Sequence, residues 1–583
     1  MKKLLLTISA VALSAATYAQ VIVAGISPQS IVANYTHTWA DPGSGWGTPD
    51  FNIPGTYVQD TLMVVDDGST GTNAQGNPIT AEGCNPLINN LTGKIAVVFR
   101  NTCEFGMKAL NAQNAGAVGV IVVNRNPGEV IAMGAGASGA NVTIPVVMLD
   151  INDGLALIAE MANGPVVAFL GNKTGLFPND AGISGGAALM PRQAIIASQL
   201  AQNGTEFNFD LGARVYNYGN QAQSNVSLKA TITNPSGATV YDNTVSGLSI
   251  AAGDSTDVDP SQASNLPNFS LASYPAGTYT LTYTVSLGVP DNYDADNTLT
   301  TTFTVSDSLF GYAQVDATVG VPTGGNYYRP GTNNQTFSTC QVIDNANASR
   351  VKAKGVWFSA TTSAASGSVL TGEEMALYLY KWEDVFADLN DANLAFNTLT
   401  EVANGFYYYP DDLQGETVYG AFTTPVALED NQRYLACVQT VNLNLYLGHE
   451  NGTNLTWNEA YYLQPMTPNE SDGTWYAAGF GSDLPSSMAV ALMDNDVNVA
   501  ELNTIDGKAF PNPATDVVTV SIEGEGVAQL VVTDVTGKVA MSGALNLAAG
   551  QADVNLDALQ AGLYIFNVTL ENGKTAQFNV VKK

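Results

Sequence analysis

The chain has only two histidines, His37 and His449, and they stand far apart in the sequence. Serine and cysteine hydrolases use a histidine base, and zinc peptidases need nitrogen or sulfur ligands at set spacing. The chain contains no HExxH sequence and no histidine cluster. We therefore expect no catalytic residue of these peptidase types, and we interpret both histidines as surface or packing residues.

Two glycine-rich stretches match known motifs in their letters only. Gly134–Gly139 fits GxGxxG, but a strand rather than a helix is predicted to follow it, so no phosphate-binding helix end is formed. Gly182–Gly186 fits GxSxG, but Pro178–Ala181 is not the strand that must precede a nucleophilic Ser184. We interpret the first stretch as a surface loop and the second as a turn.

Pairs of acidic residues occur among the aromatic residues of the third quarter of the chain. Two carboxylates suffice for glycoside hydrolysis, and aromatic rings can stack on sugars. Neighbouring carboxylates more often solvate a loop, so we predict no catalytic residue here and keep hydrolysis and sugar binding as alternatives. The pairs are Glu373-Glu374, Glu383-Asp384 and Asp411-Asp412.

Oxygen-rich loops at Asp291–Asn297 and Asp494–Asp496 have the ligand type that Ca²⁺ prefers. Neither has the spacing of an EF-hand loop, and clustered Asp and Asn are common in turns. We expect no cofactor, Ca²⁺ being the one alternative.

Length and charge exclude several classes of protein. A chain of 583 residues exceeds the usual size of a single core, which predicts several domains. The formal net charge is −31, and the 21 Lys and Arg residues are scattered. Without a basic patch, nucleic acid and anionic membranes are poor partners. The low charged fraction, with abundant Gly, Thr, Asn and Val, favours a β-rich secreted protein.

The first nineteen residues have the pattern of a secretory signal. Lys2 and Lys3 precede an apolar run, and Thr17-Tyr18-Ala19 forms a cleavage site before Gln20. No later apolar run is long enough to span a bilayer as a helix, so we expect no transmembrane segment. Four cysteines in an exported chain predict two disulfides.

Two short apolar runs around a helical pattern predict a βαβ unit. The runs lie within Gly93–Arg100 and Val118–Val123, and Phe105, Ala109 and Ala112 recur at helical spacing between them. A second unit is predicted with a strand at Thr143–Leu149, a helix at about Gly154–Ala162 and a strand at Pro165–Leu170.

These units carry the motifs of a known domain. The sequence resembles the protease-associated (PA) domain over residues 20–172, although Asn101 replaces the usual glycine. The resemblance implies an α/β-containing interaction module without catalytic residues, and it implies a disulfide between Cys84 and Cys103. Cys340 and Cys437 are then left as the second pair. The matching motifs are Gly83-Cys84-Asn85-Pro86, Gly93-Lys94-Ile95, Arg100, Phe105, Lys108, Ala115-Gly116-Ala117, Ile144-Pro145 and Asp153-Gly154.

The middle of the chain predicts two β-sandwiches. After a linker at 173–204, in which Pro191–Gln202 is predicted as a helix, residues 205–306 alternate apolar and polar residues between turns. Val215–Asn220, Gly277–Tyr279 and Asp294–Asn297 resemble immunoglobulin-like adhesion modules of bacterial surface proteins. Residues 307–497 are rich in aromatic residues and predict a jelly-roll-like sandwich with strands at Val351–Ser359 and Met375–Trp382.

A linker at 498–504 precedes the last domain, residues 505–583. It resembles the C-terminal sorting domain of the type IX secretion system of Bacteroidota, and Tyr564, Phe566, Val568 and Leu570 alternate on one strand face. The resemblance implies the type IX secretion machinery as partner and release or attachment at the outside of the outer membrane. Its motif residues are Pro511, Asn512, Pro513, Gly537, Lys538, Gly562, Tyr564, Lys582 and Lys583.

Together these patterns predict a multidomain, mainly β protein that is secreted or held at the cell surface. We expect it to be a non-catalytic binding or adhesion protein with an extracellular protein, peptide or glycan as ligand. The alternative is a secreted hydrolase, with its activity in residues 307–497, or an accessory subunit of a peptidase.

Overall fold

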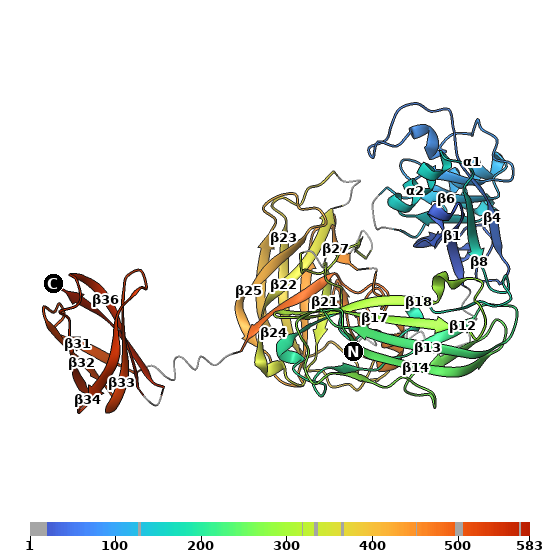
Figure 1. Cartoon of the computed structure of the whole chain (residues 1–583). Coiled ribbons are helices and arrows are strands. Elements are labelled where there is room, and N and C mark those ends of the chain that lie inside the picture. Colours follow the sequence, from blue (N-terminus) through green and yellow to red (C-terminus); the bar gives the residue numbers. More distant parts are fainter. Residues whose placement is uncertain are drawn as a thin grey trace. The chain divides into compact units, whose positions relative to one another are not determined.

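The computed structural model describes residues 20–125, 130–316, 319–330, 336–362, 367–450, 452–495, 505–570 and 573–583. The chain divides into two compact units, one ending at Asp494 and the other beginning at Asn495 (Figure 1). The predicted signal at residues 1–19 and the predicted linker at 498–504 lie outside the described residues. Within that described part, none of the helices combines the length and the apolar character needed to cross a bilayer.

An eight-stranded mixed sheet forms the region predicted as a PA domain (Figure 1). Four consecutive strands, β4 to β7, run parallel, and β5, β6 and β7 are buried throughout, as their apolar sequences predict. In sheet order the strands are β2 (Ala33–Asn34), β1 (Val21–Ser27), β8 (Val167–Asn172), β4 (Tyr57–Val64), β5 (Ile95–Phe99), β6 (Gly119–Val123), β7 (Val146–Leu149) and β3 (His37–Trp39).

Helices α1 (Phe105–Asn114) and α2 (Ile151–Met161) cover opposite faces of this sheet. Ala109 of α1 shares a core cluster with Ala96 and Val98, whereas Leu157 of α2 shares one with Ile95 and Val97. Successive side chains of a strand point to opposite faces, so β5 contributes to both clusters. The predicted βαβ unit is confirmed.

The start of α2 differs from the sequence-based expectation. The helix begins at Ile151 rather than near Gly154, because the Asp150 side chain accepts hydrogen bonds from the backbone N–H groups of Asn152 and Asp153. An aspartate in this position is a preferred helix N-cap.

The next part of the chain is a β-sandwich with a two-stranded ribbon. One sheet contains β10 (Ile195–Ala197), β18 (Thr298–Ser306), β17 (Gly277–Ser286), β13 (Gln223–Thr233) and β14 (Thr239–Ile250). The other contains β15 (Ser255–Val258), β12 (Ala213–Asn217) and β9 (Ala181–Gly182), and the ribbon is β11 (Asn208–Phe209) with β16 (Phe269–Ser270). The immunoglobulin-like identity of this part stays a prediction.

The helix predicted at Pro191–Gln202 is wrong. This stretch contains strand β10 and a short 3₁₀ helix, Ser198–Leu200. Ile195 pairs in parallel with Thr304 of β18, and the three residues of β10 are buried. Pairing with a neighbouring strand overrides the local helical pattern, which β-branched isoleucines support only weakly. Residues 173–204, which we expected to link two domains, thus contribute two strands to the fold.

Two six-stranded antiparallel sheets make up residues 307–495. The first has β19 (Leu309–Phe310), β30 (Met488–Asp494), β22 (Val351–Thr362), β27 (Leu445–His449), β20 (Asn326–Tyr328) and β25 (Thr417–Ala427), which pairs with β22. The second has β24 (Leu399–Tyr408), β23 (Glu374–Trp382), β26 (Arg433–Thr440), β21 (Phe337–Ile343), β28 (Asn469–Ser471) and β29 (Thr474–Tyr476), and one short helix, α3, spans Thr456–Tyr462. One hydrophobic cluster runs from this sandwich into the preceding one, including Val305, Phe310 and Val490.

The C-terminal unit consists of a three-stranded and a four-stranded sheet around its own core. Tyr564, Phe566, Val568 and Leu570 of β36 are buried, as their alternation predicts. The strands are β31 (Gly507–Phe510), β32 (Val517–Ile522) and β35 (Gln551–Asn555) in the first sheet, and β34 (Val539–Leu547), β33 (Gly526–Asp534), β36 (Gly562–Leu570) and β37 (Thr575–Lys582) in the second.

A buried charge cluster joins the eight-stranded sheet to the sandwich that follows it. Lys173, directly after β8, is fully buried, and its Nζ contacts a carboxylate oxygen of Asp180 and lies 3.0 Å from Asp296 Oδ2. The rings of Tyr218 and Tyr293 each have their centroid 4.6 Å from this ammonium. Gln20, at the start of the sheet region, donates to Asp296 Oδ2 at 3.1 Å. The cluster thus connects both parts of the chain.

Two carboxylates face one ammonium in this cluster, so binding of a proton to one of the carboxylates is favoured. Burial raises the pKa of Asp180 to about 7 and that of Asp296 to about 6. An unfolded aspartate titrates near pH 4, so between about pH 4 and 7 the folded junction binds more protons than the unfolded chain. The contribution of these groups to stability therefore falls as pH rises through this range.

We predict that hydrogen exchange at residues 173–182 and 291–297, corrected for the intrinsic rate, is slower at pH 5 than at pH 8. Asp180→Asn, which mimics the protonated carboxyl group, should reduce this difference. Asp242→Asn, at an exposed surface ion pair, is the control and should leave it unchanged. Slower exchange at pH 8 would contradict the assignment.

Candidate functional site

The carboxyl ends of β4, β5 and β6 bring three connecting loops to one edge of the sheet. In sheets with parallel strands this edge is where binding groups gather, because the loops that follow the strands meet there. The loops are residues 65–94, residues 100–104 and the described parts of the segment between β6 and β7, residues 124–125 and 130–145. We call this surface the carboxyl edge.

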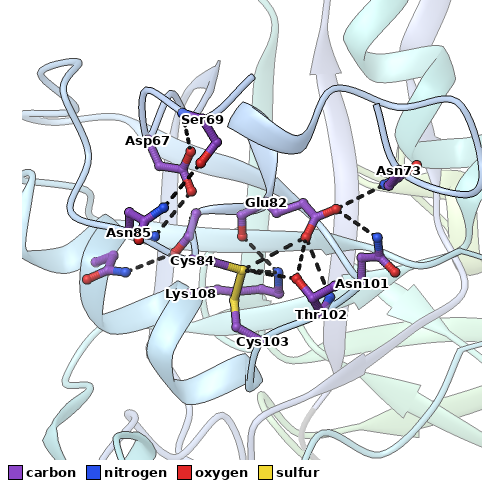
Figure 2. The surroundings of a disulfide bond; sticks show 12 residues. Asp67, Ser69, Asn73, Glu82, Cys84, Asn85, Asn101, Thr102, Cys103 and Lys108 are labelled. Carbon is purple, nitrogen blue, oxygen red and sulfur yellow. Dashed lines mark hydrogen bonds between the residues drawn. A yellow bond between two sulfur atoms is a disulfide. The ribbon is translucent and has the colours of Figure 1, made fainter. Parts of the chain in front are cut away.

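A disulfide connects the first two loops of the carboxyl edge (Figure 2). Cys84 lies in the loop after β4 and Cys103 in the loop after β5, and their Cα atoms are 5.8 Å apart. The bond closes a short segment containing all of β5, and a loop of this size contributes about 3 kcal/mol in the chain-entropy account.

Glu82, beside this disulfide, is a hydrogen-bond acceptor for several loop residues (Figure 2). Its side chain accepts from Asn73 Nδ2 at 3.2 Å, from Asn101 Nδ2 at 2.9 Å and from Thr102 Oγ1 at 2.9 Å, and the residue is 1% exposed. Burial raises its pKa, but these hydrogen bonds and the Lys108 charge outweigh burial and hold the pKa below its usual value. Glu82 is therefore ionised at neutral pH and fixes both loops.

Lys108 of α1 reaches the same cluster and is fully buried. Its Nζ donates to the backbone oxygen of Glu82 at 2.8 Å and lies 3.6 Å from Cys84 Sγ (Figure 2). Burial lowers its pKa to about 8, against the opposing charges of Glu82 and Asp67. The ammonium is thus charged at neutral pH and is held by a backbone carbonyl.

Further hydrogen bonds fix the rest of the edge. Asp67 accepts from the backbone N–H of Asn85 at 3.1 Å and from that of Ser69 at 3.0 Å. Arg100 Nη1 donates to Asn124 Oδ1 at 2.7 Å, which ties the loop after β5 to the loop after β6. The ionisable groups of this cluster are used as structural hydrogen-bonding groups. Together with those of Glu82, these contacts connect the three loops of the carboxyl edge.

We predict that Glu82→Gln loosens the carboxyl edge, because an amide nitrogen would then face donors that now share a carboxylate. A lost charged acceptor costs about 1–3 kcal/mol. Hydrogen exchange in residues 66–104 of the full chain should accelerate about tenfold or more. Glu160→Gln on α2 is the matched control; equal exchange in the two variants would refute the role of Glu82.

The structure separates the two histidines and packs each of them against backbone. His37 begins strand β3, and its Nδ1 lies 2.9 Å from the backbone oxygen of Tyr35. His449 is buried, its Nδ1 lies 3.1 Å from Leu447 O, and the rings of Tyr328 and Phe480 surround it. Burial lowers the pKa of His449 to about 4, so it is neutral at physiological pH.

Neither glycine-rich motif forms the site that its letters suggest. Residues 134–141 cross the start of α1, where Ala137 N donates to Glu104 Oε2 at 2.9 Å, and the chain continues into β7. Gly106 of α1 allows this close crossing, since a Cβ there would lie 2.1 Å from Ala135 O. Ser184 follows the short strand β9 and precedes a 3₁₀ turn.

The acidic pairs hold turns and neighbouring strands. Asn442 Nδ2 donates to Glu373 Oε2, Thr400 Oγ1 to Glu383 Oε2 and Leu370 N to Asp412 Oδ1, each at 2.8 Å. These contacts are those of carboxylates that stabilise loops.

The loop considered for Ca²⁺, Asp291–Asn297, belongs to the buried charge cluster. Asp296 faces the ammonium of Lys173, and Asp291 Oδ2 accepts from Ala181 N at 3.0 Å. In the second loop, Asp494 accepts from Gln199 Nε2 at 2.7 Å, and Asp496 lies outside the described residues. Among the residues whose positions are described, no three His, Cys, Asp or Glu side chains are grouped to hold a metal ion.

The remaining predicted site residues are the cysteines and the residues of the sorting motif. The structure forms both disulfides, Cys84–Cys103 and Cys340–Cys437, the latter joining paired residues of β21 and β26. In the C-terminal unit, Asn512, between Pro511 and Pro513, donates to Asn579 O and accepts from Val581 N. Gly537, at φ 81°, and Lys538 turn the chain between β33 and β34. Gly562 begins β36, Tyr564 donates to Gln560 O, Lys582 to Thr515 O, and Lys583 N to Ala514 O.

Sequence reasoning missed two features of this molecule. Glu82 directly precedes the Gly83-Cys84 motif, but its role depends on donors from the loop after β5. Lys173, Asp180 and Asp296 are spread along the chain, so no local spacing identifies their cluster. The sequence feature that could have indicated this cluster is a lone lysine, Lys173, directly after a buried strand.

Two stretches of the chain match known domain families. Residues 53–157 match the family described as PA domain, and residues 508–582 match the secretion system C-terminal sorting domain. The sorting domain implies export by the type IX secretion system and attachment at the cell surface. Both regions lie where the sequence motifs predict them.

The similarity to whole proteins is confined to short stretches. The chain is 40% identical over 75 residues to the minor extracellular protease Vpr of Bacillus subtilis, and 35% identical over 89 residues to signal peptide peptidase-like 2 of Arabidopsis thaliana. These matches cover 13% and 15% of this chain and only 9% and 16% of those proteins. Among solved structures, a zinc aminopeptidase from Bacillus subtilis matches at 21% identity over 26% of this chain and 30% of that chain, with a TM-score of 0.18.

Proposed function

We propose that this protein is a non-catalytic binding or adhesion protein of the cell surface, with the carboxyl edge of its PA domain as a protein-interaction surface. The observation that carries the proposal is that the charged side chains of this edge make hydrogen bonds within the protein. Glu82, Lys108 and Asp67 are engaged by hydrogen bonds that fix the loops. A surface fixed before binding loses little conformational entropy when a partner binds.

An apolar side chain stands on this fixed surface. Ile88 is 70% exposed, and its backbone N–H donates to Asp66 O at 2.8 Å, directly after β4. A single exposed isoleucine is ordinary, but beside hydrogen-bonding loops it supplies an apolar anchor of the kind found at the centre of protein interfaces. The combination supports a protein or peptide as the ligand of this edge.

Ile88→Glu should weaken binding of extracellular proteins or peptides to the chain by about tenfold or more, because a charge would replace the anchor. Binding is measured on peptide, protein and glycan arrays with residues 20–504 and then by titration with the ligands that bind. Ile53→Glu is the matched control, since Ile53 is 58% exposed but precedes β4 and so lies at the opposite end of the strand. Equal loss in both variants would argue against the carboxyl edge.

The alternative function is that of a secreted hydrolase or of an accessory subunit that acts beside a separate peptidase. The similarity of 75 residues of this chain to part of an extracellular protease favours the accessory role. A hydrolase would have its activity in residues 307–497. Peptide cleavage by the purified chain that a point substitution abolishes would support the hydrolase and overturn the binding proposal.

Deleting residues 505–583 should leave the rest of the chain folded and trap it in the periplasm. The deleted residues have a hydrophobic core of their own, so their loss exposes no core of the remaining chain. Fractionation of cells that produce the truncated chain measures the outcome, and cells that produce the full-length chain are the control. Normal delivery of the truncated chain to the surface would contradict the sorting role.

A further inference from the structure

A small pocket lies beside the segment that follows the PA domain, where it meets the aromatic-rich sandwich. Arg192, Asp344, Arg433 and Tyr462 are among its lining residues, and its cavity volume is about 30 Å³. A water molecule needs roughly 10–15 Å³ in this measure, so the pocket has room for a group with two polar atoms, such as a carboxylate. The pocket lies outside the carboxyl edge and none of the functions above uses it.

One of its two arginines, Arg433, already contacts a carboxylate and a backbone carbonyl. Arg433 Nε lies 3.5 Å from Asp344 Oδ2, and its Nη2 donates to Phe386 O at 3.2 Å. Its guanidinium carbon is also 4.0 Å from the centroid of the Phe386 ring. The Asp344 carboxylate offsets the charge of Arg433, so Arg433 helps to shape the pocket without adding a net charge.

The second arginine keeps its charge available. The Arg192 side chain is exposed and lies over the ring of Tyr462, 5.0 Å from the centroid. Across the described residues, no carboxylate lies within ion-pair distance of Arg192. Such a cation is notable in a chain with 52 acidic and 21 basic residues. Tyr462 is itself fixed, because its hydroxyl accepts from Asp210 N at 3.2 Å.

We propose that this pocket binds the terminal carboxylate of a peptide, with Arg192 as the residue that donates to it. A guanidinium offers two parallel donors that match the two oxygens of a carboxylate. The net charge of the lining arginines and Asp344 is one positive charge, which balances a monoanion but not a phosphate dianion. Val342, Pro465 and Met466 are the apolar residues beside the proposed carboxylate position.

The test uses residues 20–583 and two small probes, N-acetyl-leucine and N-acetyl-leucinamide, titrated by ligand-observed NMR. The acid should bind at least about tenfold more tightly than the amide, because only the acid carries the charge. Arg192→Gln should weaken binding of the acid by about tenfold or more. Lys229→Gln, which removes a charge from an exposed ion pair on β13, should have no effect.

A second variant should raise the affinity for the acid, an effect that a purely structural role of the pocket would not produce. Asp344→Asn removes the carboxylate that competes with the ligand, so binding of N-acetyl-leucine should tighten several-fold. Equal affinity for the acid and the amide, no effect of Arg192→Gln, or tighter binding of glucuronate than of N-acetyl-leucine would each overturn the proposal. Ile88→Glu should leave this binding unchanged, so the two binding surfaces are tested independently.

Discussion

The burial of Lys173 is the interaction on which the arrangement of the first two parts of the chain depends. An ammonium removed from water is costly, and here two carboxylates and two tyrosine rings replace its hydration. All four groups come from residues 180–296, whereas Lys173 directly follows strand β8 of the eight-stranded sheet. Removing Lys173 would leave two buried carboxylates without their counter-ion, so the ammonium holds the segments that carry them beside the end of β8.

The same physical device recurs at the carboxyl edge of the sheet. Lys108 is buried against a backbone carbonyl, and Glu82 collects donors from loops that the sequence keeps apart. At this edge the ionisable groups hydrogen-bond to the protein and connect its loops.

The sequence was sufficient for the elements whose signals are local. Buried apolar runs predicted β5 and β6, helical spacing predicted α1, and strand alternation predicted the buried face of β36. It failed at residues 191–202, because β10 forms only by pairing with β18, which comes much later in the chain. The sequence did not predict the charge clusters for the same reason. The partners of Lys173 and of Glu82 are distant in the sequence and come together only in the folded chain. Family motifs located two domains but could not indicate the pocket beside Arg192, which several distant segments build.

The Cys340–Cys437 disulfide has a mechanical consequence for a protein displayed outside the cell. It joins paired residues of β21 and β26, strands separated by β22 to β25 in the sequence. Tension applied along the chain passes through this covalent bond. The segment between the two cysteines, whose sequence separation is 97, therefore bears no load and is not extended. Stretching under shear is thereby confined to the segments outside residues 340–437, and the inner strands of the aromatic-rich sandwich can survive forces that extend the rest of the molecule.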